Sequence, residues 1–281
     1  MNDNYTYTFG KQIIDLSSRT HVMGILNVTP DSFSDGGKYL NVDDAVEYGK
    51  QMAADGADFI DIGGASTRPG SDEISVDEEL GRIMPVLLRL KDEIALPLSV
   101  DTYRSEVADE ALKNGAMIIN DISAFNFDEK MPEVVSKHKA TCILMHIKGT
   151  PKNMQENPEY ENVVAEILKY FEQAVWKANV NGIDQVIIDP GFGFGKTPEH
   201  NLTIVKNLSK FKKLDCPVMI GVSRKSTIGK LSGGGIDDRL EGTIALNTIS
   251  ILNGVNLIRV HDVKENVRAA KLIDSYRKLS T

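Results

Sequence analysis

QVIIDPG (185–191) is a short apolar run, rich in β-branched residues, that ends in polar and turn-forming residues, and seven similar runs recur along the chain. The others are HVMGILNV (21–28), FIDIGG (59–64), PLSVD (97–101), MIIND (117–121), TCILMH (141–146), PVMIGVS (217–223) and LIRVHD (257–262). Their nearly continuous apolar character is typical of parallel strands that are buried on both faces. The sequence therefore predicts a buried parallel sheet.

Helical patterns fill most of the gaps between these runs. Apolar residues recur at helical spacing in 43–55, 75–93 and 160–180. Strands that alternate with helices along 281 residues predict an α/β fold, the (β/α)8 or TIM barrel, as a single domain over 1–281. A doubly wound open sheet is the alternative. It usually carries a dinucleotide fingerprint after its first strand, and NVTPDSFSDGG (27–37) is no such fingerprint.

Local signals refine this prediction. Ser75 with Glu78 forms a capping-box pattern, and Thr197-Pro198 is typical of a helix start. We expect the last two helices to be capped by Asp237 and Asp262. Before the barrel, YTYTF (5–9) and QIIDL (12–16) flank Gly10-Lys11, which predicts a hairpin that caps the bottom of the barrel.

Composition excludes several classes of protein. The chain has 32 basic and 40 acidic residues, a net charge of −8, without blocks of like charge, which argues against a nucleic-acid or anionic-membrane partner. No apolar run approaches the ~20 residues of a bilayer span, and the N-terminus does not read as a signal peptide. The two cysteines, Cys142 and Cys216, lie in apolar segments, so we expect buried reduced thiols and a cytoplasmic protein.

The ends of the predicted strands carry the candidate site. Catalytic residues of a TIM barrel lie at the C-terminal ends of the strands and in the loops that follow. These ends are mostly polar here, more so than a purely structural barrel requires. They are Asn27, Asp61, Asp101, Asn120, Asp121, His146, Asp189, Ser223, Arg259 and His261.

Two loops at this end are long and rich in turn formers. NVTPDSFSDGG (27–37) carries paired aspartates and is either an ordinary connection or a loop that closes over a ligand. Asn27 offers an amide oxygen that can ligate Mg²⁺. GGASTRPG (63–70) carries Arg68, which favours binding of a carboxylate or phosphate over a plain surface turn.

Later loops add a basic corner. DPGFGFGKT (189–197) is no Walker A motif, because Pro190 stands where the first glycine is required, and it remains a glycine-rich turn. GVSRKS (221–226) follows the seventh strand, where barrels commonly bind anions. Arg259 and His261 are two residues apart on the eighth strand and suit an anion clamp better than a packing role. Together these features suit a polar heterocycle beside a phosphate or diphosphate leaving group, with a divalent metal.

At these residues the chain closely resembles the dihydropteroate synthases. The resemblance runs nearly end to end, through MGILNVTPDSFSDGG (23–37), DIGGASTRPG (61–70), VDTYR (100–104), IINDIS (118–123), LMHIKGTP (144–151), IIDPGFGFGK (187–196), GVSRKS (221–226) and RVHDV (259–263). It implies a pterin-binding barrel that condenses 6-hydroxymethyl-7,8-dihydropterin diphosphate with 4-aminobenzoate in folate synthesis. It also implies Mg²⁺, a site that sulfonamides target and a homodimer formed through the late helices.

The resemblance also implies roles for individual residues. The pterin would be bound by Asp189, Asn120 and Asp101, with Met145 and Phe194 among the substrate-binding residues and Lys225 at the pterin carbonyl. Asn27 would hold the metal, and Arg259 with His261 the diphosphate. The aminobenzoate site would be shaped by Thr67, Arg68, Pro69, Phe33 and Ser226, with Asp35 joining on closure. The residues expected to take part in catalysis are Asp101, Asp35, Lys225, Arg259 and His261.

The chemistry of these groups suggests a dissociative reaction, in which diphosphate leaves before the weakly basic aryl amine attacks. Two alternatives remain. Pterin-binding methyltransferases that serve corrinoid proteins use a related barrel but should lack the two long loops and the Arg259/His261 site. A non-catalytic pterin-binding protein would release no diphosphate.

Overall fold

The computed structural model describes residues 5–29, 41–66, 70–71, 73–235 and 237–279. Eight parallel strands lie in the order β8-β7-β6-β5-β4-β3-β10-β9. A bridge between Ile188 and Val218 joins the two ends of this order, so the sheet comes round into a barrel. The predicted barrel is confirmed. Its strands are β3 (His21–Asn27), β4 (Phe59–Gly63), β5 (Leu98–Asp101), β6 (Ile118–Asp121), β7 (Thr141–Met145), β8 (Val186–Asp189), β9 (Met219–Ile220) and β10 (Leu257–Val260).

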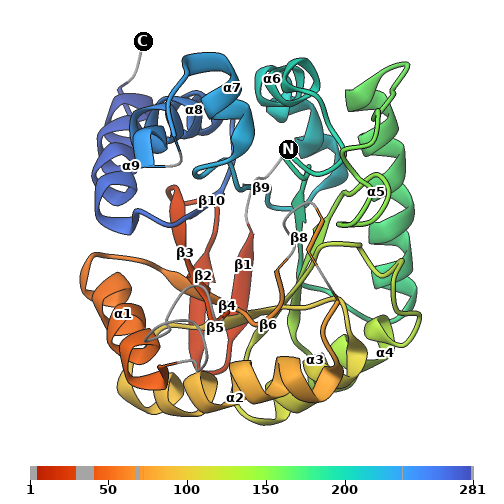
Figure 1. Ribbon diagram of the computed structural model, residues 1–281, viewed down its shortest axis with the longest axis vertical. Helices are drawn as coiled ribbons and strands as arrows, with labels where there is room; N and C mark the ends of the chain where they lie inside the picture. The colour runs from red at the N-terminus through yellow and green to blue at the C-terminus, as the bar shows by residue number, and fades with distance from the viewer. Residues whose placement is uncertain (1–4, 30–40, 67–69, 72, 236, 280–281) are drawn as a thin grey trace.

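Helices surround the barrel and separate successive strands (Figure 1). They are α1 (Val42–Ala54), α2 (Val76–Glu93), α3 (Ser105–Lys113), α4 (Met131–His138), α5 (Val163–Val180), α6 (Pro198–Lys206), α7 (Ser226–Ser232), α8 (Leu240–Leu252) and α9 (Val263–Arg277), with 3-10 turns at Leu208–Leu214 and Asp237–Arg239. Among the described residues, no helix has both the length and the apolar character needed to cross a membrane.

Two predicted helix starts are confirmed. The Ser75 side chain accepts from the Glu78 backbone N–H, and that of Thr197 accepts from His200, ahead of Pro198 at the start of α6. The prediction for Asp237 is wrong, because this residue begins the 3-10 turn that precedes α8.

Asp262 does stand before α9, as predicted, but its side chain does not cap that helix. Its carboxylate instead accepts two bonds from the Arg224 guanidinium, including one of 2.9 Å from Nε. A bidentate charged partner is a stronger attraction for this carboxylate than a backbone N–H.

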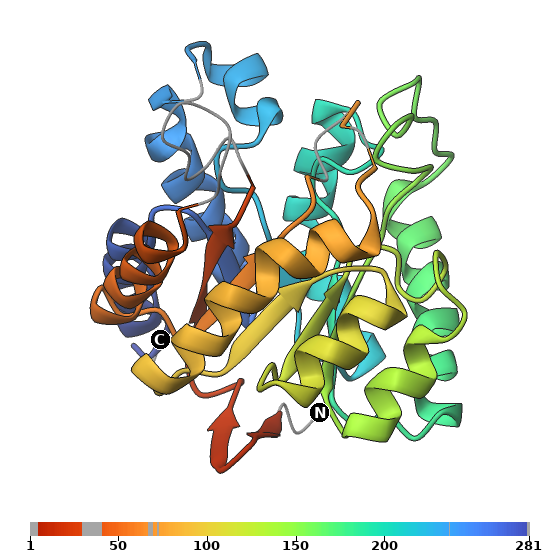
Figure 2. The ribbon, with the colours of Figure 1, turned by 60° about the horizontal axis from the view of Figure 1, so that its bottom comes forward.

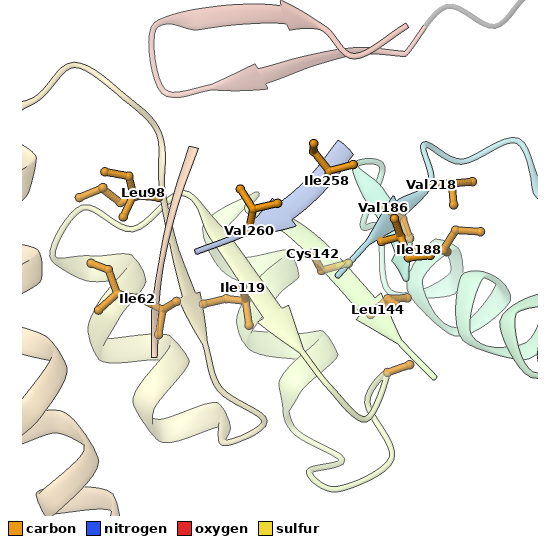
Figure 3. Packing of buried hydrophobic residues seen from close by; sticks show 14 of the residues in the cluster. Ile62, Leu98, Ile119, Cys142, Leu144, Val186, Ile188, Val218, Ile258 and Val260 are labelled. Atoms are coloured by element: carbon orange, nitrogen blue, oxygen red, sulfur yellow. The ribbon is translucent and has the colours of Figure 1, made fainter. Parts of the chain in front are cut away.

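Strand alternation divides the core into two parts. Side chains that point outward pack against the helices and form the larger apolar cluster, part of which is shown in Figure 3 with Ile62, Ile119 and Ile188 labelled. Side chains that point inward near the N-terminal ends of the strands form a second cluster inside the barrel. Its members on the barrel strands are Met23, Phe59, Ile118, Ile143, Ile187, Met219 and Leu257.

The N-terminal hairpin closes the bottom of the barrel over this inner cluster, as predicted. Strands β1 (Thr6–Phe9) and β2 (Gln12–Asp15) pair antiparallel and lie at one end of the barrel, opposite the segment that contains α7 (Figure 2). The Phe9 ring meets that of Phe59 edge-on, with 5.2 Å between centroids. The Tyr7 hydroxyl donates to the carbonyl of Val186 at 2.9 Å. Because the hairpin fills the bottom of the barrel, a functional site is left with the opposite end, where the C-terminal ends of the strands lie.

Candidate active site

The inward-facing positions change from apolar to polar as the strands approach their C-terminal ends. Two residues beyond members of the inner apolar cluster, the same face carries the polar residues Asp61, Asn120, Asp189 and Arg259, with the apolar Met145 beside them. Asp101 ends β5 at the same level, because it pairs in register with Gly63 and Asn120. The side-chain period of a strand, which is two, thus gathers the predicted polar residues at the mouth of the barrel.

Arg259 lies at the centre of this polar layer. Its Nε donates to Asp61 Oδ2 at 2.6 Å, and its Nη2 donates to Asp101 Oδ2 at 2.9 Å. Asn120 Nδ2 also donates to Asp61 Oδ2, at 2.9 Å. The Arg259 side chain is 17% exposed, so the guanidinium still reaches the mouth. Two carboxylates therefore hold this guanidinium in place.

Asp101 is poised to change charge near neutral pH. Its carboxyl is enclosed by the barrel, and this burial raises its pKa to about 7, helped by the charge of Asp61 and opposed by Arg259. A carboxyl group with a strongly raised pKa in a concave site is typical of functional sites.

Asp189 and Lys225 are a second set of oppositely charged residues at the mouth, and each affects the pKa of the other. Asp189 is 4% exposed, and its Oδ1 accepts from the Gly191 N–H at 2.8 Å. Burial raises the pKa of Asp189, while Lys225 acts against this shift. Burial likewise lowers the pKa of Lys225 to about 8, against the effect of Asp189. Lys225 Nζ donates to the Phe192 carbonyl and lies 4.4 Å from the centroid of the Phe194 ring.

Two glycines keep the space between these groups open. A Cβ atom at Gly221 would lie 3.8 Å from Arg259 Cβ and 4.0 Å from Asp189 Oδ2. At Gly63 it would lie 3.4 Å from Asn27 Oδ1 and 3.9 Å from Asp101 Oδ2. Both positions face inward, so the missing side chains leave room beside Asp189 at Gly221 and beside Asn27 and Asp101 at Gly63.

His261 and Ser226 lie at the rim. His261 follows β10; its backbone N–H donates to Ser223 Oγ at 3.2 Å, and its Nδ1 lies 3.1 Å from the same oxygen. Ser226 is exposed and opens α7 directly after Lys225. The structure thus places His261 beside the end of the strand that carries Arg259.

Comparison with known proteins is consistent with this geometry. The model of the pterin binding enzyme family matches residues 23–261. A dihydropteroate synthase of Clostridium beijerinckii is 43% identical over 268 residues, which cover 94% of this chain and 97% of that protein. The chain belongs to the dihydropteroate synthase family.

Solved structures agree with this membership. A dihydropteroate synthase of Yersinia pestis in complex with a sulfonamide drug superposes with a TM-score of 0.93 at 40% identity, covering 98% of this chain and 100% of that one. A Xanthomonas albilineans dihydropteroate synthase in complex with 7,8-dihydropteroate gives a TM-score of 0.87 at 37% identity, covering 97% and 98%. Full-length similarity of this kind places the chain with the synthases.

Several residues that the dihydropteroate synthase resemblance assigns to the aminobenzoate site lie outside the described residues. They are Phe33, Asp35, Thr67, Arg68 and Pro69. Their roles stay predictions.

Two residues that this structure connects to the synthase site received no role from the sequence. Asp61 was recognised only as a polar strand end, yet it joins Arg259 to Asn120. Lys196 ends the glycine-rich turn and is 2% exposed. The sequence signal for Asp61 was an acidic residue inside an apolar strand; for Lys196 we find no signal, because lysine after a turn is usually exposed.

Proposed function

We propose that this chain condenses 6-hydroxymethyl-7,8-dihydropterin diphosphate with 4-aminobenzoate at the mouth of the barrel, giving 7,8-dihydropteroate and diphosphate. The observation that carries the proposal is the cluster of Asp101, Asp189, Lys225 and Arg259, in which Asp189 is buried, the other three are partly buried, and acidic and basic groups lie close enough to shift one another's pKa values. The edge of a pterin presents ring N–H, amino and carbonyl groups, which such a cluster can match. The diphosphate requires cationic partners, which the basic groups supply.

The pterin ring is assigned to the deeper part of the cluster. The Asp189 carboxylate accepts from the amino and ring N–H groups, and Lys225 donates to the ring carbonyl. The amide nitrogen of Asn120 is already bonded to Asp61, so its amide oxygen is the atom assigned to the pterin. Met145 and Phe194 supply apolar surface beside the ring, since both belong to one apolar cluster near the mouth.

The diphosphate is assigned to Arg259 and His261. The bond between the pterin methylene carbon and the diphosphate oxygen breaks, and its electron pair leaves with the diphosphate, where these two side chains stabilise the added charge. The methylene cation is delocalised into the electron-rich ring, and the Asp101 carboxylate stabilises it. The aryl amine nitrogen then forms the new bond with its lone pair and loses a proton to solvent or to the released diphosphate.

We also propose a Mg²⁺ ion at Asn27. The fit rests on the gap beside Gly63, which the side-chain oxygens of Asn27 and Asp101 both face. The described residues contain no cluster of three or more His, Cys, Asp or Glu side chains that could hold a metal by themselves. This suits Mg²⁺, which usually keeps several waters and binds through one or two protein ligands together with substrate phosphates. When bound there, the ion would add positive charge beside the leaving group.

The aminobenzoate is assigned to the outer part of the mouth, between Lys225 and Ser226 and the predicted loop residues Phe33, Thr67 and Pro69. Sulfonamides mimic aminobenzoate, so we expect them to compete with it and to bind only after the pterin site is filled. Substitution of Phe33, Thr67 or Pro69 should weaken the sulfonamide more than the substrate. Inhibition kinetics against aminobenzoate test this assignment, and noncompetitive inhibition would count against it.

The proposed reaction is tested by measuring diphosphate release with each substrate alone and with both. Release of dihydropteroate and diphosphate that requires both substrates is the expected result. If the pterin diphosphate binds in calorimetry but neither product forms, the chain is a pterin-binding protein without synthase activity.

A homodimer through α8 and α9 is also proposed. The two helices pack against each other and expose Ile249, Leu252, Leu272 and Tyr276, which are 46%, 48%, 69% and 64% exposed. Exposed apolar side chains on two neighbouring helices favour a protein partner. Sedimentation velocity tests the proposal: Ile249→Glu should yield monomer, and Ile13→Glu, on the hairpin, should not.

The buried free thiols of the two cysteines support a reducing cytoplasmic location.

A further inference from the structure

Lys196 is a buried lysine whose donors are all used inside the protein. Its Nζ lies 2.9 Å from the carbonyl oxygens of Gly191 and Phe194 and 2.9 Å from His146 Nδ1, with the His146 carbonyl at 3.3 Å. An ammonium group has three N–H donors, so it satisfies the three nearest acceptors completely. Burial lowers the pKa of His146, and the charge of Lys196 adds to this shift. A neutral ring with a free lone pair on Nδ1 is the acceptor that Lys196 requires.

The backbone is shaped to admit this side chain. Gly191 has a φ of +71°, and a Cβ atom there would lie 1.9 Å from the His146 carbonyl oxygen. The turn therefore lies directly against the end of β7 and encloses the Lys196 ammonium between the two segments.

The same turn carries groups of the pterin site. The Phe192 carbonyl accepts from Lys225 Nζ, and the Phe194 ring lies against that ammonium. The Gly191 N–H donates to Asp189 Oδ1. By holding this turn in place, Lys196 also holds the turn's groups that contact Lys225 and Asp189. Lys196 itself contacts neither substrate.

We propose that Lys196 is a positioning residue of the pterin site, which fastens the 190–195 turn to the end of β7 and supports the negative charge of Asp189. The inference rests on the proposed function in one respect, that Asp189 and Lys225 bind the pterin.

The electrostatic part follows from the groups that face Asp189. These are Lys225 and Arg259 across the mouth and Lys196 beneath it, and each lowers the pKa of a carboxyl that burial raises. Burial lowers the pKa of Lys196 well below its ordinary value; Asp189 opposes this shift, and Lys225 and Lys148 add to it. The three acceptors 2.9 Å from Nζ favour the charged ammonium at this position. Removing the Lys196 charge should therefore raise the pKa of Asp189, and the pterin would lose its ionised acceptor at a higher pH than in the wild type.

Two substitutions separate the mechanical from the electrostatic effect. Lys196→Met removes both the bonds and the charge, whereas Lys196→Gln removes the charge but keeps two N–H donors for the turn. Lys148→Met is the matched control. Lys148 is close enough to Lys196 to affect its pKa but is 44% exposed, and its substitution removes the same net charge as Lys196→Met. The probe is 6-hydroxymethyl-7,8-dihydropterin, which lacks the diphosphate, and its affinity is measured by calorimetry from pH 5 to pH 8.

We expect Lys196→Met to bind the probe about tenfold more weakly than the wild type at pH 8. The affinity for the probe falls as the pH is lowered, and we call this fall the acid limb of binding. The acid limb should move to higher pH in both Lys196 variants, and Lys148→Met should behave as the wild type. A merely structural role would not move the acid limb. If the methionine variant does not fold, the acid limb of the glutamine variant decides.

Wild-type affinity and an unshifted acid limb in folded Lys196 variants would overturn the proposal. Failure of the wild type itself to bind the probe would instead overturn the proposed function.

Discussion

At the scale of single residues, Asp189 is the side chain on which pterin recognition depends most directly. Replacing it by alanine removes a charged acceptor from a buried site, and we expect pterin affinity to fall by ~2–4 kcal/mol. Calorimetry with the pterin diphosphate measures the loss. Asp184→Ala serves as the control, because Asp184 is exposed just before the opposite end of β8. Equal affinity in Asp189→Ala and the wild type would remove Asp189 from the site.

Arg259 gives a second prediction at this scale. If it stabilises the departing diphosphate, Arg259→Ala should raise the barrier by ~2–4 kcal/mol, as expected for one lost charge-stabilising donor. Binding of a pterin without diphosphate should change much less when it is measured at a pH where Asp189 stays ionised, because Arg259 also favours the ionised form of that carboxyl. The substitution also leaves Asp61 and Asp101 without their guanidinium, so urea unfolding must show that the variant is folded.

The order of bond breaking can be tested on the wild type. With an unreactive aminobenzoate analogue bound, isotope exchange between bridging and nonbridging diphosphate oxygens should proceed without product, because ionisation precedes attack. No exchange, with the analogue bound and the diphosphate free to rotate, would favour direct displacement.

At the scale of elements, the glycine-rich turn after β8 shows how closely a loop and a strand can be fitted. Gly191→Ala would bring a methyl group to 1.9 Å from the His146 carbonyl at a φ of +71°. Gly233→Ala has a similar φ of +80° but meets nothing within 4 Å. Both substitutions carry the backbone strain of a positive φ, and Gly233, with a ψ of −179°, lies in a region open almost only to glycine. A larger loss at Gly191 would therefore have to come from the clash.

We expect Gly191→Ala to lose more stability than Gly233→Ala in urea unfolding, and to bind the pterin more weakly as well. Losses of the same size in both variants would mean that backbone strain alone accounts for the effect and that the contact with His146 is not tight.

At the scale of the whole molecule, the closed barrel produces the pH dependence. Asp101 must be ionised to stabilise a cation, and its pKa is raised to about 7. Lys225 must be protonated to donate to the pterin, and its pKa is lowered to about 8. The kcat/KM for the pterin diphosphate should therefore rise as the pH passes about 7 and fall as it passes about 8. A profile that stays flat from pH 6 to pH 9 would contradict these assignments.

Stability gives an independent measurement of the Asp101 shift. A carboxyl group with a raised pKa in the folded state binds a proton there that the unfolded chain has already released, so its contribution is present at low pH and is lost as the pH rises through about 7. The wild type should accordingly lose stability relative to Asp101→Asn between about pH 4 and pH 7. Urea unfolding across this range checks the sign.

Much of the architecture is determined by local sequence patterns. Buried apolar runs and helical periodicity predict the alternation of strands and helices, and polar residues at the strand ends predict where the site lies. Local patterns were less reliable where another part of the chain competes for a side chain. Asp262 lies at a helix start as expected, but Arg224, 38 residues away, takes its carboxylate.

What the tertiary structure alone decided is which of these residues meet. Arg259 contacts Asp61 and Asp101 across 198 and 158 residues of chain, and the Lys196 ammonium meets His146 across 50. The sequence determined the barrel, its polar mouth and the family, because periodicity and motifs are properties of neighbouring residues. The partners of Arg259 and Lys196, and the altered pKa values of the mouth, arise only when closure of the barrel brings distant strands together and removes their charged groups from water.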